Sequence, residues 1–207
     1  MPWIISGIIV SYFLGSIPTA YIFARLLKGI DIRKFGSGNI GATNALRVLG
    51  RPAGITVLIL DILKGFLAVA FWGDFILSRS AYLPAELLLI VLGLACICGH
   101  IWTVFLRFKG GKGVATTFGV LLGLGIKIAG LKLIVGLAIL SWLLVFISTH
   151  IVSLASVVTA VTLPLYMVLF KQSYALVLLS VILSAFIILR HRTNLKRIYR
   201  REEKKLF

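Results

Sequence analysis

Long apolar stretches, separated by short polar or glycine-rich segments, run through the whole chain. A helix needs about 20 mostly apolar residues to cross a bilayer. The pattern therefore predicts an all-α integral membrane protein with about seven transmembrane helices. The expected spans are 3–27, 52–73, 83–106, 114–128, 131–147, 151–170 and 173–190. The fourth is short for a full crossing, so we expect it to be tilted or partly inserted. No soluble domain or long linker interrupts the pattern, so we treat residues 1–207 as one polytopic domain.

The composition supports the membrane assignment and excludes a nucleic-acid-binding module. Of the 207 residues, 60% are hydrophobic and 14% are charged, and the formal net charge is +16. Such a charge is typical of proteins that bind nucleic acid, but apolar stretches of membrane-spanning length separate the basic residues here. We therefore expect no nucleic-acid partner.

The Lys and Arg residues fall mainly on one side of the predicted membrane. If the N-terminus lies outside, sixteen of them lie in the loops and tail of one side, and four lie in the loops of the other. Because positive residues are enriched in cytoplasmic loops, the basic side and the C-terminus are predicted to be cytoplasmic. For the basic tail as a group, topology and contact with anionic lipid are the default interpretation.

The first basic loop begins Gly36-Ser-Gly-Asn-Ile-Gly, a G-x-G-x-x-G pattern. A dinucleotide site would need a preceding strand, and membrane spans flank this loop, so we reject that function. Glycines still let backbone amides approach an anion, and Arg47 adds a planar fork of donors. We interpret the loop as a phosphate-binding segment, with a flexible turn as the alternative. Its neutral hydrogen-bonding residues are Ser37, Asn39, Thr43 and Asn44.

The second basic loop contains Lys109 and Lys112 on either side of two glycines, followed by Gly113. It lacks the spacing of a Walker A loop, so nucleotide hydrolysis is not supported. The pattern favours a backbone nest with two ammonium groups at a helix N-terminus, where the helix dipole also favours an anion. The alternative is an ordinary positive-inside loop. Upstream, His100 at the membrane edge is either a hydrogen-bonded structural group or a proton carrier.

Two further polar segments are predicted to lie on the cytoplasmic side, and one pair of charges is predicted to lie inside the second span. Residues 148–156 bring hydroxyl groups to the start of the sixth span, and residues 191–197 close the last span with His, Arg and Asn. Asp61 and Lys64 are close enough to meet on one helix face. Charges at that depth face the bundle or each other, so this pair is either an internal ion pair or a direct substrate contact.

These motifs resemble the bacterial acyl-phosphate:glycerol-3-phosphate acyltransferases of the PlsY type, polytopic enzymes of phospholipid synthesis. The resemblance covers nearly the whole chain. Two departures concern His150-Ile151, where the family has an Arg-Tyr-like pair, and Arg201, which precedes two glutamates where the family usually has glycine. The segments that carry the resemblance are 37–47, 99–100, 108–116, 153–156 and 191–194.

The resemblance also implies roles for individual residues. Those expected to hold or orient glycerol 3-phosphate are Ser37, Arg47, Lys112, Ser156, His191 and Asn194. Those expected to frame the head of an acyl phosphate are Thr43, Asn44, Gly111 and Gly113. We add Asn39 and Lys109 as substrate-binding candidates, and we take Asn194, Lys112 and His100 as the catalytic candidates.

The implied reaction transfers an acyl group from acyl phosphate to the C1 hydroxyl of glycerol 3-phosphate, with release of inorganic phosphate. Because phosphate is a good leaving group, with a second pKa near 6, positioning and charge stabilisation are the main tasks. We expect no metal and no cofactor. The partners are the two substrates and membrane lipid. Three candidates for the base stay open: His100, His191 and the phosphate of the acceptor itself.

The expected location is the bacterial cytoplasmic membrane, with the active site on the cytoplasmic side. The main alternative is an anion or phosphate-ester transporter, which would favour an inverted repeat and a site at the bilayer midplane. We see no repeat, and the polar segments lie on one side. A transferase acting on polyprenyl phosphates is a second alternative, but it needs acidic residues for Mg²⁺, and the chain has only six Asp and Glu.

Overall fold

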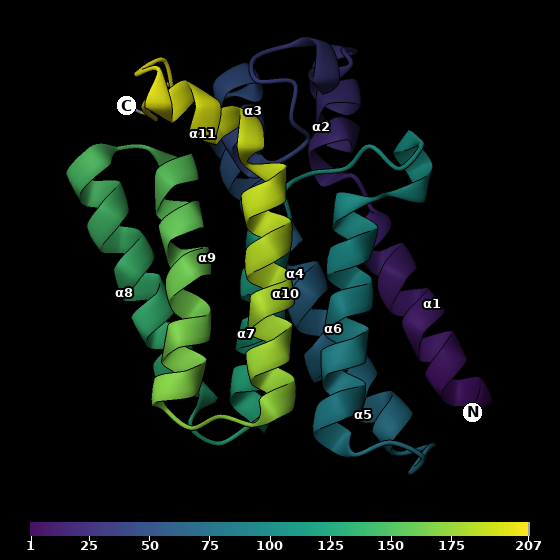
Figure 1. Cartoon of the computed structure of the whole chain (residues 1–207). Coiled ribbons are helices and arrows are strands. Elements are labelled where there is room, and N and C mark those ends of the chain that lie inside the picture. Colours follow the sequence, from purple (N-terminus) through teal and green to yellow (C-terminus); the bar gives the residue numbers. More distant parts are fainter. Residues whose placement is uncertain (207) are drawn as a thin grey trace. The chain divides into compact units, whose positions relative to one another are not determined.

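A computed structural model describes residues 1–206, which form helices and loops without a strand (Figure 1). The chain divides into two compact units, Met1–Lys127 and Ile128–Phe207. The first unit contains α1 (Pro2–Ser16), α2 (Thr19–Lys28), η1 (Ile32–Lys34), α3 (Ala42–Leu49), α4 (Arg51–Ala70), α5 (Trp72–Leu77), α6 (Ala85–Ile101), η2 (Val104–Leu106) and α7 (Val114–Lys127). The second contains α8 (Leu131–Thr149), α9 (Val152–Leu169), α10 (Tyr174–Arg190) and α11 (Arg192–Tyr199).

Helices occupy all seven of the ranges predicted to span the membrane, but not all of them are long enough to do so. Within residues 1–206, five segments are long and apolar enough to cross, and a sixth is added if α10 and α11 count as one bent span. The fourth predicted span corresponds to α7, which has only 14 residues. The all-helical membrane architecture is therefore confirmed, while the count of seven stays a prediction.

The first predicted span, 3–27, matches a candidate span over Pro2–Lys28, but this span is made of two helices and not of one continuous helix. Helix α1 ends at Ser16 and α2 begins at Thr19, with Pro18 between them. Proline has no N–H group and disfavours the helical conformation of the residue before it. Two carbonyls at the break receive side-chain donors: Thr103 Oγ1 donates to the Ser16 carbonyl at 2.5 Å, and Lys64 Nζ donates to the Ile17 carbonyl at 3.2 Å.

Glycines let pairs of helices in the first unit pack with their backbones in contact. A Cβ at Gly119 of α7 would lie 1.9 Å from the Ile62 carbonyl oxygen of α4, and one at Gly65 of α4 would lie 2.2 Å from the Thr116 carbonyl oxygen. Helices α1 and α6 meet in the same way at Gly15, where a Cβ would lie 1.9 Å from the Cys96 carbonyl oxygen. Small residues at such contacts are typical of helix packing in membranes.

At one end of the first unit, a small apolar core joins the two basic loops. Its members are Ala20, Ala24, Ile32, Ile40, Ala45, Val57 and Leu106. Ile32 and Ile40 come from the first loop, and Leu106 comes from the second. The first loop also contains helix α3, which the sequence pattern did not predict. This core holds both loops at the same end of the unit, which we call the loop end.

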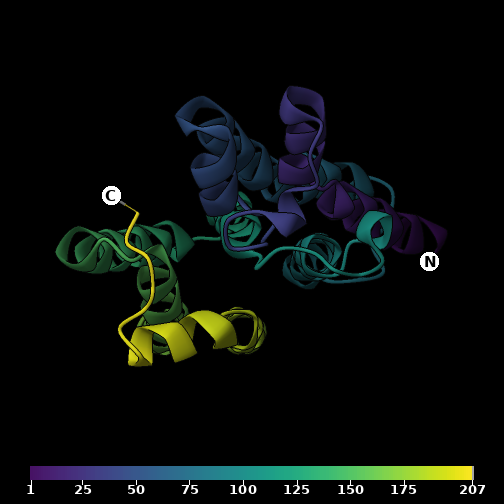
Figure 2. The same ribbon diagram turned by 90° about the horizontal axis from the view of Figure 1, so that it is seen from above.

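In the second unit, α8, α9 and α10 run alongside one another and α11 turns away from the axis of α10. The bend between α10 and α11 is 60°. Figure 2, which looks down along α10, shows α11 leading off sideways. His191 lies at this bend and Asn194 lies in the first turn of α11.

We predict that Gly119→Ala lowers the thermal stability of the protein in detergent, because the added methyl group meets the backbone of α4. Overpacking of this kind costs about 1–3 kcal/mol. Gly136→Ala in α8 is the matched control, since within residues 1–206 the added carbon meets nothing within 4 Å apart from its chain neighbours and the nearby backbone of its own helix. Equal melting temperatures for the two variants would contradict the close α4–α7 contact.

Candidate functional site

Asn44 organises the first basic loop from within. Its Oδ1 accepts a hydrogen bond from the Ser37 amide at 2.8 Å, and its Nδ2 donates to the carbonyls of Asn39 at 2.8 Å and Phe35 at 3.1 Å. Gly36 has a φ of +60°, and a Cβ there would lie 2.2 Å from Asn44 Oδ1. The side chain that was expected to frame a substrate is thus committed to shaping the loop, and it positions the exposed Ser37.

Arg47 lies in the last turn of α3 with an exposed side chain. Lys28 Nζ donates to the neighbouring Val48 carbonyl at 2.6 Å and so attaches the end of α3 to α2. Earlier in the loop, Arg33 pairs with Asp31 at 2.7 Å. The hydrogen bond from Arg33 lowers the pKa of Asp31 to about 2 and raises the pKa of Arg33. The Asp31 carboxylate of the first loop is therefore already paired with Arg33.

The glycines of the second loop fold back onto the end of α6. The Gly110 and Gly111 amides donate to the Ile101 and His100 carbonyls at 3.1 and 3.0 Å. Gly111 also lies against the His100 ring, because a Cβ there would be 2.2 Å from Nε2. These two amides satisfy carbonyls at a helix end and are already engaged. A close approach of the backbone therefore explains both glycines.

Helix α7 begins directly after Lys112 and Gly113, as the sequence indicated. Its first intrahelical bond runs from the Thr117 amide to the Gly113 carbonyl at 2.8 Å, so the preceding amides of the first turn have no partner within the helix. The Thr116 and Thr117 hydroxyl groups are buried and have no hydrogen-bond partner in the described part of the chain. A helix N-terminus next to a lysine suits an anion.

Asp61 and Lys64 meet as predicted, at 2.8 Å. Both are buried between α2, α4 and α6. Thr19 Oγ1 also donates to Asp61 Oδ1 at 2.7 Å, and His100 Nδ1 lies 3.8 Å from the same oxygen. The pair is therefore an internal ion pair below the second loop.

In the second unit, the buried carboxylate of Glu203 gathers polar groups from α9 and α11. Asn194 Nδ2 donates to Glu203 Oε1 at 2.5 Å, and Ser153 Oγ donates to the same oxygen at 2.8 Å. Arg197 Nε lies 3.6 Å from Oε2. Asn194 is buried, and this contact sets the orientation of its amide plane.

His191 and Ser156 are also engaged within the second unit. His191 is buried, and its Nδ1 lies 2.7 Å from the Ile187 carbonyl oxygen. Since a carbonyl only accepts, Nδ1 carries the hydrogen, and in the neutral ring Nε2 is then the basic nitrogen. Ser156 Oγ donates to the Val152 carbonyl at 2.8 Å and accepts from Trp142 Nε1 at 3.3 Å.

Arg201 takes the backbone conformation that glycine adopts most readily. Its φ is +58°, in the left-handed region. Beyond the end of α11, the Arg201 amide donates to the Ile198 carbonyl and the Glu202 amide donates to the Arg197 carbonyl. The turn that brings Glu203 back to Asn194 therefore forms with arginine at this position, despite the steric cost of the left-handed region for a residue with a Cβ.

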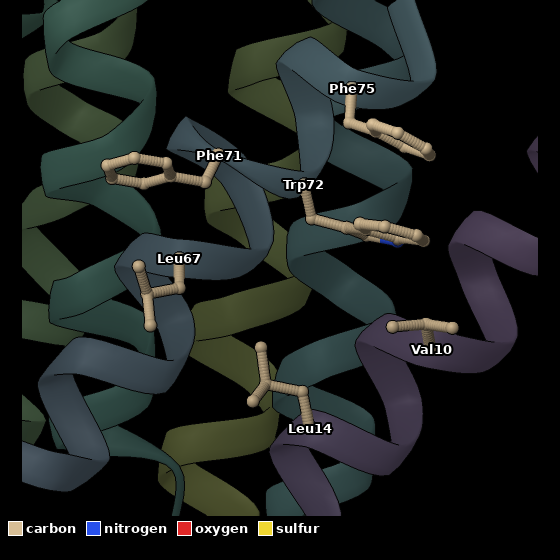
Figure 3. Close-up of a pocket in the computed structure, with 6 residues that line it drawn as sticks. All are labelled: Val10, Leu14, Leu67, Phe71, Trp72 and Phe75. Carbon is tan, nitrogen blue, oxygen red and sulfur yellow. The ribbon is translucent and has the colours of Figure 1, made fainter. Parts of the chain in front are cut away.

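An apolar hollow of 380 Å³ lies elsewhere in the first unit (Figure 3). Val10 and Leu14 of α1 line one side, Leu67 lies on α4, and aromatic rings line the rest of this open hollow. The indole N–H of Trp72 donates to the Gly7 carbonyl at 3.2 Å. This hollow suits a hydrocarbon chain and not a phosphate group. Its aromatic residues are Phe71, Trp72 and Phe75.

A model of the family described as "Glycerol-3-phosphate acyltransferase" matches residues 5–201. The chain belongs to the glycerol-3-phosphate acyltransferase family. The relative named glycerol-3-phosphate acyltransferase from Geotalea daltonii is 45% identical over 92% of this chain and 91% of its own length. The one from Rippkaea orientalis is 42% identical over 100% of this chain and 95% of its own length.

Two crystal structures of PlsY (YgiH), described as an integral membrane glycerol 3-phosphate acyltransferase, are similar to this acyltransferase. The glycerol 3-phosphate form has a TM-score of 0.85 and 35% identity, and the lysophosphatidic acid form has a TM-score of 0.82 and 34% identity. Each match covers 98% of this chain and 94% of the crystallised chain. The resemblance stated from the motifs is thereby confirmed, as is a multi-pass membrane protein.

The predicted site residues of the acyltransferase divide between the two units. The first unit carries Ser37, Asn39, Thr43, Asn44, Arg47, His100, Lys109, Gly111, Lys112 and Gly113. The second carries Ser156, His191 and Asn194. Convergence of all these residues on one substrate stays a prediction. Sequence reasoning did not select Ser153 or Glu203, although an acidic residue in an otherwise basic tail was a usable signal.

We predict that Asn44→Asp disorders the first loop, because a carboxylate oxygen would replace Nδ2 and face the carbonyls that it now binds. Each unsatisfied buried group costs about 1–3 kcal/mol. Trypsin cleavage after Arg33 and Lys34 should become faster and acyl transfer should fall. Cleavage after Arg79, at the opposite end of the unit, is the internal control. Unchanged proteolysis of the first loop would show that Asn44 does not organise it.

Proposed function

We propose that this acyltransferase moves a fatty acyl group from acyl phosphate to the C1 hydroxyl of glycerol 3-phosphate. The products are lysophosphatidic acid and inorganic phosphate, and the reaction is the first acylation step of phospholipid synthesis. The identified family and its PlsY neighbours, in forms named for glycerol 3-phosphate and lysophosphatidic acid, support the acceptor and the product. The donor is argued from the chemistry of the loops.

The start of α7 is the observation that supports a phosphoryl donor. Lys112 precedes a helix N-terminus where two buried threonine hydroxyls, Thr116 and Thr117, have no partner in the described residues. Lysine, helix amides and hydroxyls together are the donors that a phosphate group requires. In this proposal, Lys109 and Lys112 attract the phosphate of the donor, and Gly111 and Gly113 let the loop take its shape. A compact acyl phosphate needs no further nucleotide or protein surface for its recognition.

The other site residues serve the acceptor. Arg47 and Ser37, both exposed on the first loop, bind the phosphate of glycerol 3-phosphate, and Thr43 and Asn39 frame the substrates. Asn39 Oδ1 is buried without a partner in the described residues, and as an acceptor it suits a substrate hydroxyl. In the second unit, Asn194, oriented by Glu203, holds the attacking hydroxyl, while His191 and Ser156 position the acceptor.

The reaction then needs only one bond exchange. The C1 oxygen of glycerol 3-phosphate forms a bond to the acyl carbon, and the bond from that carbon to the phosphate oxygen breaks. The electron pair leaves with phosphate, which needs no strong acid at neutral pH because its second pKa is near 6. The hydroxyl proton passes to a base, for which His100, His191 and the acceptor phosphate are candidates. Lys112 and Arg47 stabilise the negative charge.

The same proposal places the protein in the membrane. Residues 1–207 act as one acyltransferase domain in the bacterial cytoplasmic membrane, with the N-terminus outside. The loop end, with its excess of Lys and Arg, faces the cytoplasm. Glycerol 3-phosphate then arrives from water, and the fatty acyl chain arrives from the bilayer. Membrane lipid is therefore both the surroundings and the destination of the product.

We predict that the purified protein, given a long-chain acyl phosphate and glycerol 3-phosphate without metal or nucleotide, releases inorganic phosphate and lysophosphatidic acid in equal amounts. Acyl-CoA and acyl carrier protein thioesters should give no product. Phosphate release is followed colorimetrically and the lipid by mass spectrometry. Transfer from either thioester at a similar rate would reject acyl phosphate as the specific donor.

We predict that Lys112→Ala lowers acyl transfer by about 10²-fold, because a hydrogen bond from a charged donor is worth about 1.5–3 kcal/mol. The melting temperature should stay close to that of the wild type, since Lys112 is only half-buried and lies in a loop. The matched control is Lys34→Ala, which removes an exposed cation from the first loop and should keep its activity. Near-normal turnover by Lys112→Ala would remove the phosphate-binding role of this loop.

A further inference from the structure

A buried carboxylate, Asp61 of α4, lies beneath the second loop and faces side chains of two other helices, α2 and α6. Its Oδ1 accepts from Thr19 of α2 at 2.7 Å and from Lys64 of its own helix at 2.8 Å. The same oxygen lies 3.8 Å from His100 Nδ1 of α6. All four side chains are buried. Asp61 therefore joins α2, α4 and α6 at one point, just below the loop end.

Stability alone is a weak reason for such a charge cluster. Removing two charges from water costs several kcal/mol per ion, and apolar replacements of a buried pair are often neutral or stabilising. Lys64 does have a second structural task, because its ammonium group also donates to the Ile17 carbonyl at the break in the first span. Within residues 1–206, Asp61 is linked to that break through Thr19 and Lys64, and the oxygen that accepts from these two donors also faces His100.

The His100 ring connects Asp61 to the second loop. One edge of the ring, at Nδ1, faces Asp61, and the other edge, at Nε2, lies against Gly111. The main chain of His100 is part of the same contact, because its carbonyl accepts from the Gly111 amide at 3.0 Å. Lys112 is the next residue along the chain. A shift of the imidazole ring would therefore move the backbone that carries Lys112.

The segment of α4 that contains Asp61 also packs against α7, which follows the second loop. Gly65, one residue after Lys64, packs so closely on α7 that a Cβ would lie 2.2 Å from the Thr116 carbonyl oxygen. The short stretch 61–65 thus touches His100 before the loop and Thr116 after it. The loop between them, with Lys109 and Lys112, is framed at both ends by one rigid helix.

We propose that Asp61 is a positioning residue for acyl transfer: its charge orients the His100 ring, and the ring sets the place of the Gly111–Lys112 backbone. The inference rests on the proposed function of that loop in binding phosphate. At 3.8 Å the carboxylate acts on His100 as a charge and not through a direct hydrogen bond. A negative charge at this edge favours a hydrogen on Nδ1. In the neutral ring, Nε2 then presents its lone pair to the loop side.

The charge and the packing of Asp61 can be separated experimentally. Asp61→Asn keeps an oxygen that can accept from Thr19 but removes the charge, and it leaves Lys64 buried without its counter-ion. Asp61→Asn combined with Lys64→Met removes both charges and so removes that penalty. Asp74→Asn is the matched control, because Asp74 pairs with Lys127 and joins α5 to α7 at the opposite end of the same unit.

The measurements are the melting temperature in detergent, kcat, and KM for acyl phosphate and glycerol 3-phosphate. We expect the double variant to melt above Asp61→Asn alone, although it also loses the donor to the Ile17 carbonyl. Its kcat should stay about 10²-fold low, the size of effect that a 1 Å misplacement can cause. The two KM values should change less than kcat. Asp74→Asn should retain wild-type kcat. Recovery of both stability and kcat in the double variant would overturn the proposal, since Asp61 would then only support the fold.

A double-mutant cycle with His100→Gln tests the route through the ring. If Asp61 acts through His100, Asp61→Asn should cost little further rate once His100 is replaced, so that the two losses do not add. Fully additive losses would overturn that route. Wild-type protein that is inactive with acyl phosphate but active with a thioester donor would refute the proposed donor instead. The Asp61 cycle measured with that thioester would then still report on the positioning role.

Discussion

The first unit depends on one constraint: the helix break between α1 and α2 leaves backbone carbonyls that need hydrogen-bond donors among apolar side chains. Pro18 interrupts the first predicted span, and the carbonyls of Ser16 and Ile17 need donors in a place that excludes water. Thr103 and Lys64 supply them. Lys64 brings a charge with it, which Asp61 balances. The break thus accounts for an ammonium group in the interior, and the ammonium group calls for a carboxylate.

Each unit uses one buried carboxylate to hold segments that are far apart in the chain. A carboxylate suits this role because it accepts several hydrogen bonds at once and donates none. Asp61 binds Thr19 and Lys64 beneath the second loop. Glu203 binds Ser153 and Asn194 and returns the tail to α9 and α11. In both units, a carboxylate to which we give no direct contact with substrate lies next to a residue that we propose for the site: His100 near Asp61, and Asn194 at Glu203.

The candidate site could be predicted by residue type more readily than by geometry. Asn44 was selected for its amide group, but that group is spent on carbonyls of its own loop. Gly111 was selected for a backbone nest, but the His100 ring is what requires its missing side chain. Helix α3 was not predicted at all. Its Ala45 packs into a small core that also takes residues from α2, α4 and the second loop, a contact that no local pattern encodes.

The sequence by itself determined the helical class, the membrane setting, the family and the polar segments that carry the chemistry. Apolar runs and motifs are local, so they can be read without knowing what lies next to them. Tertiary structure alone decided that Asp61 faces His100 and that Arg201 takes a left-handed turn which delivers Glu203 to Asn194. Those outcomes depend on which backbones approach each other closely, and packing between distant segments sets that approach.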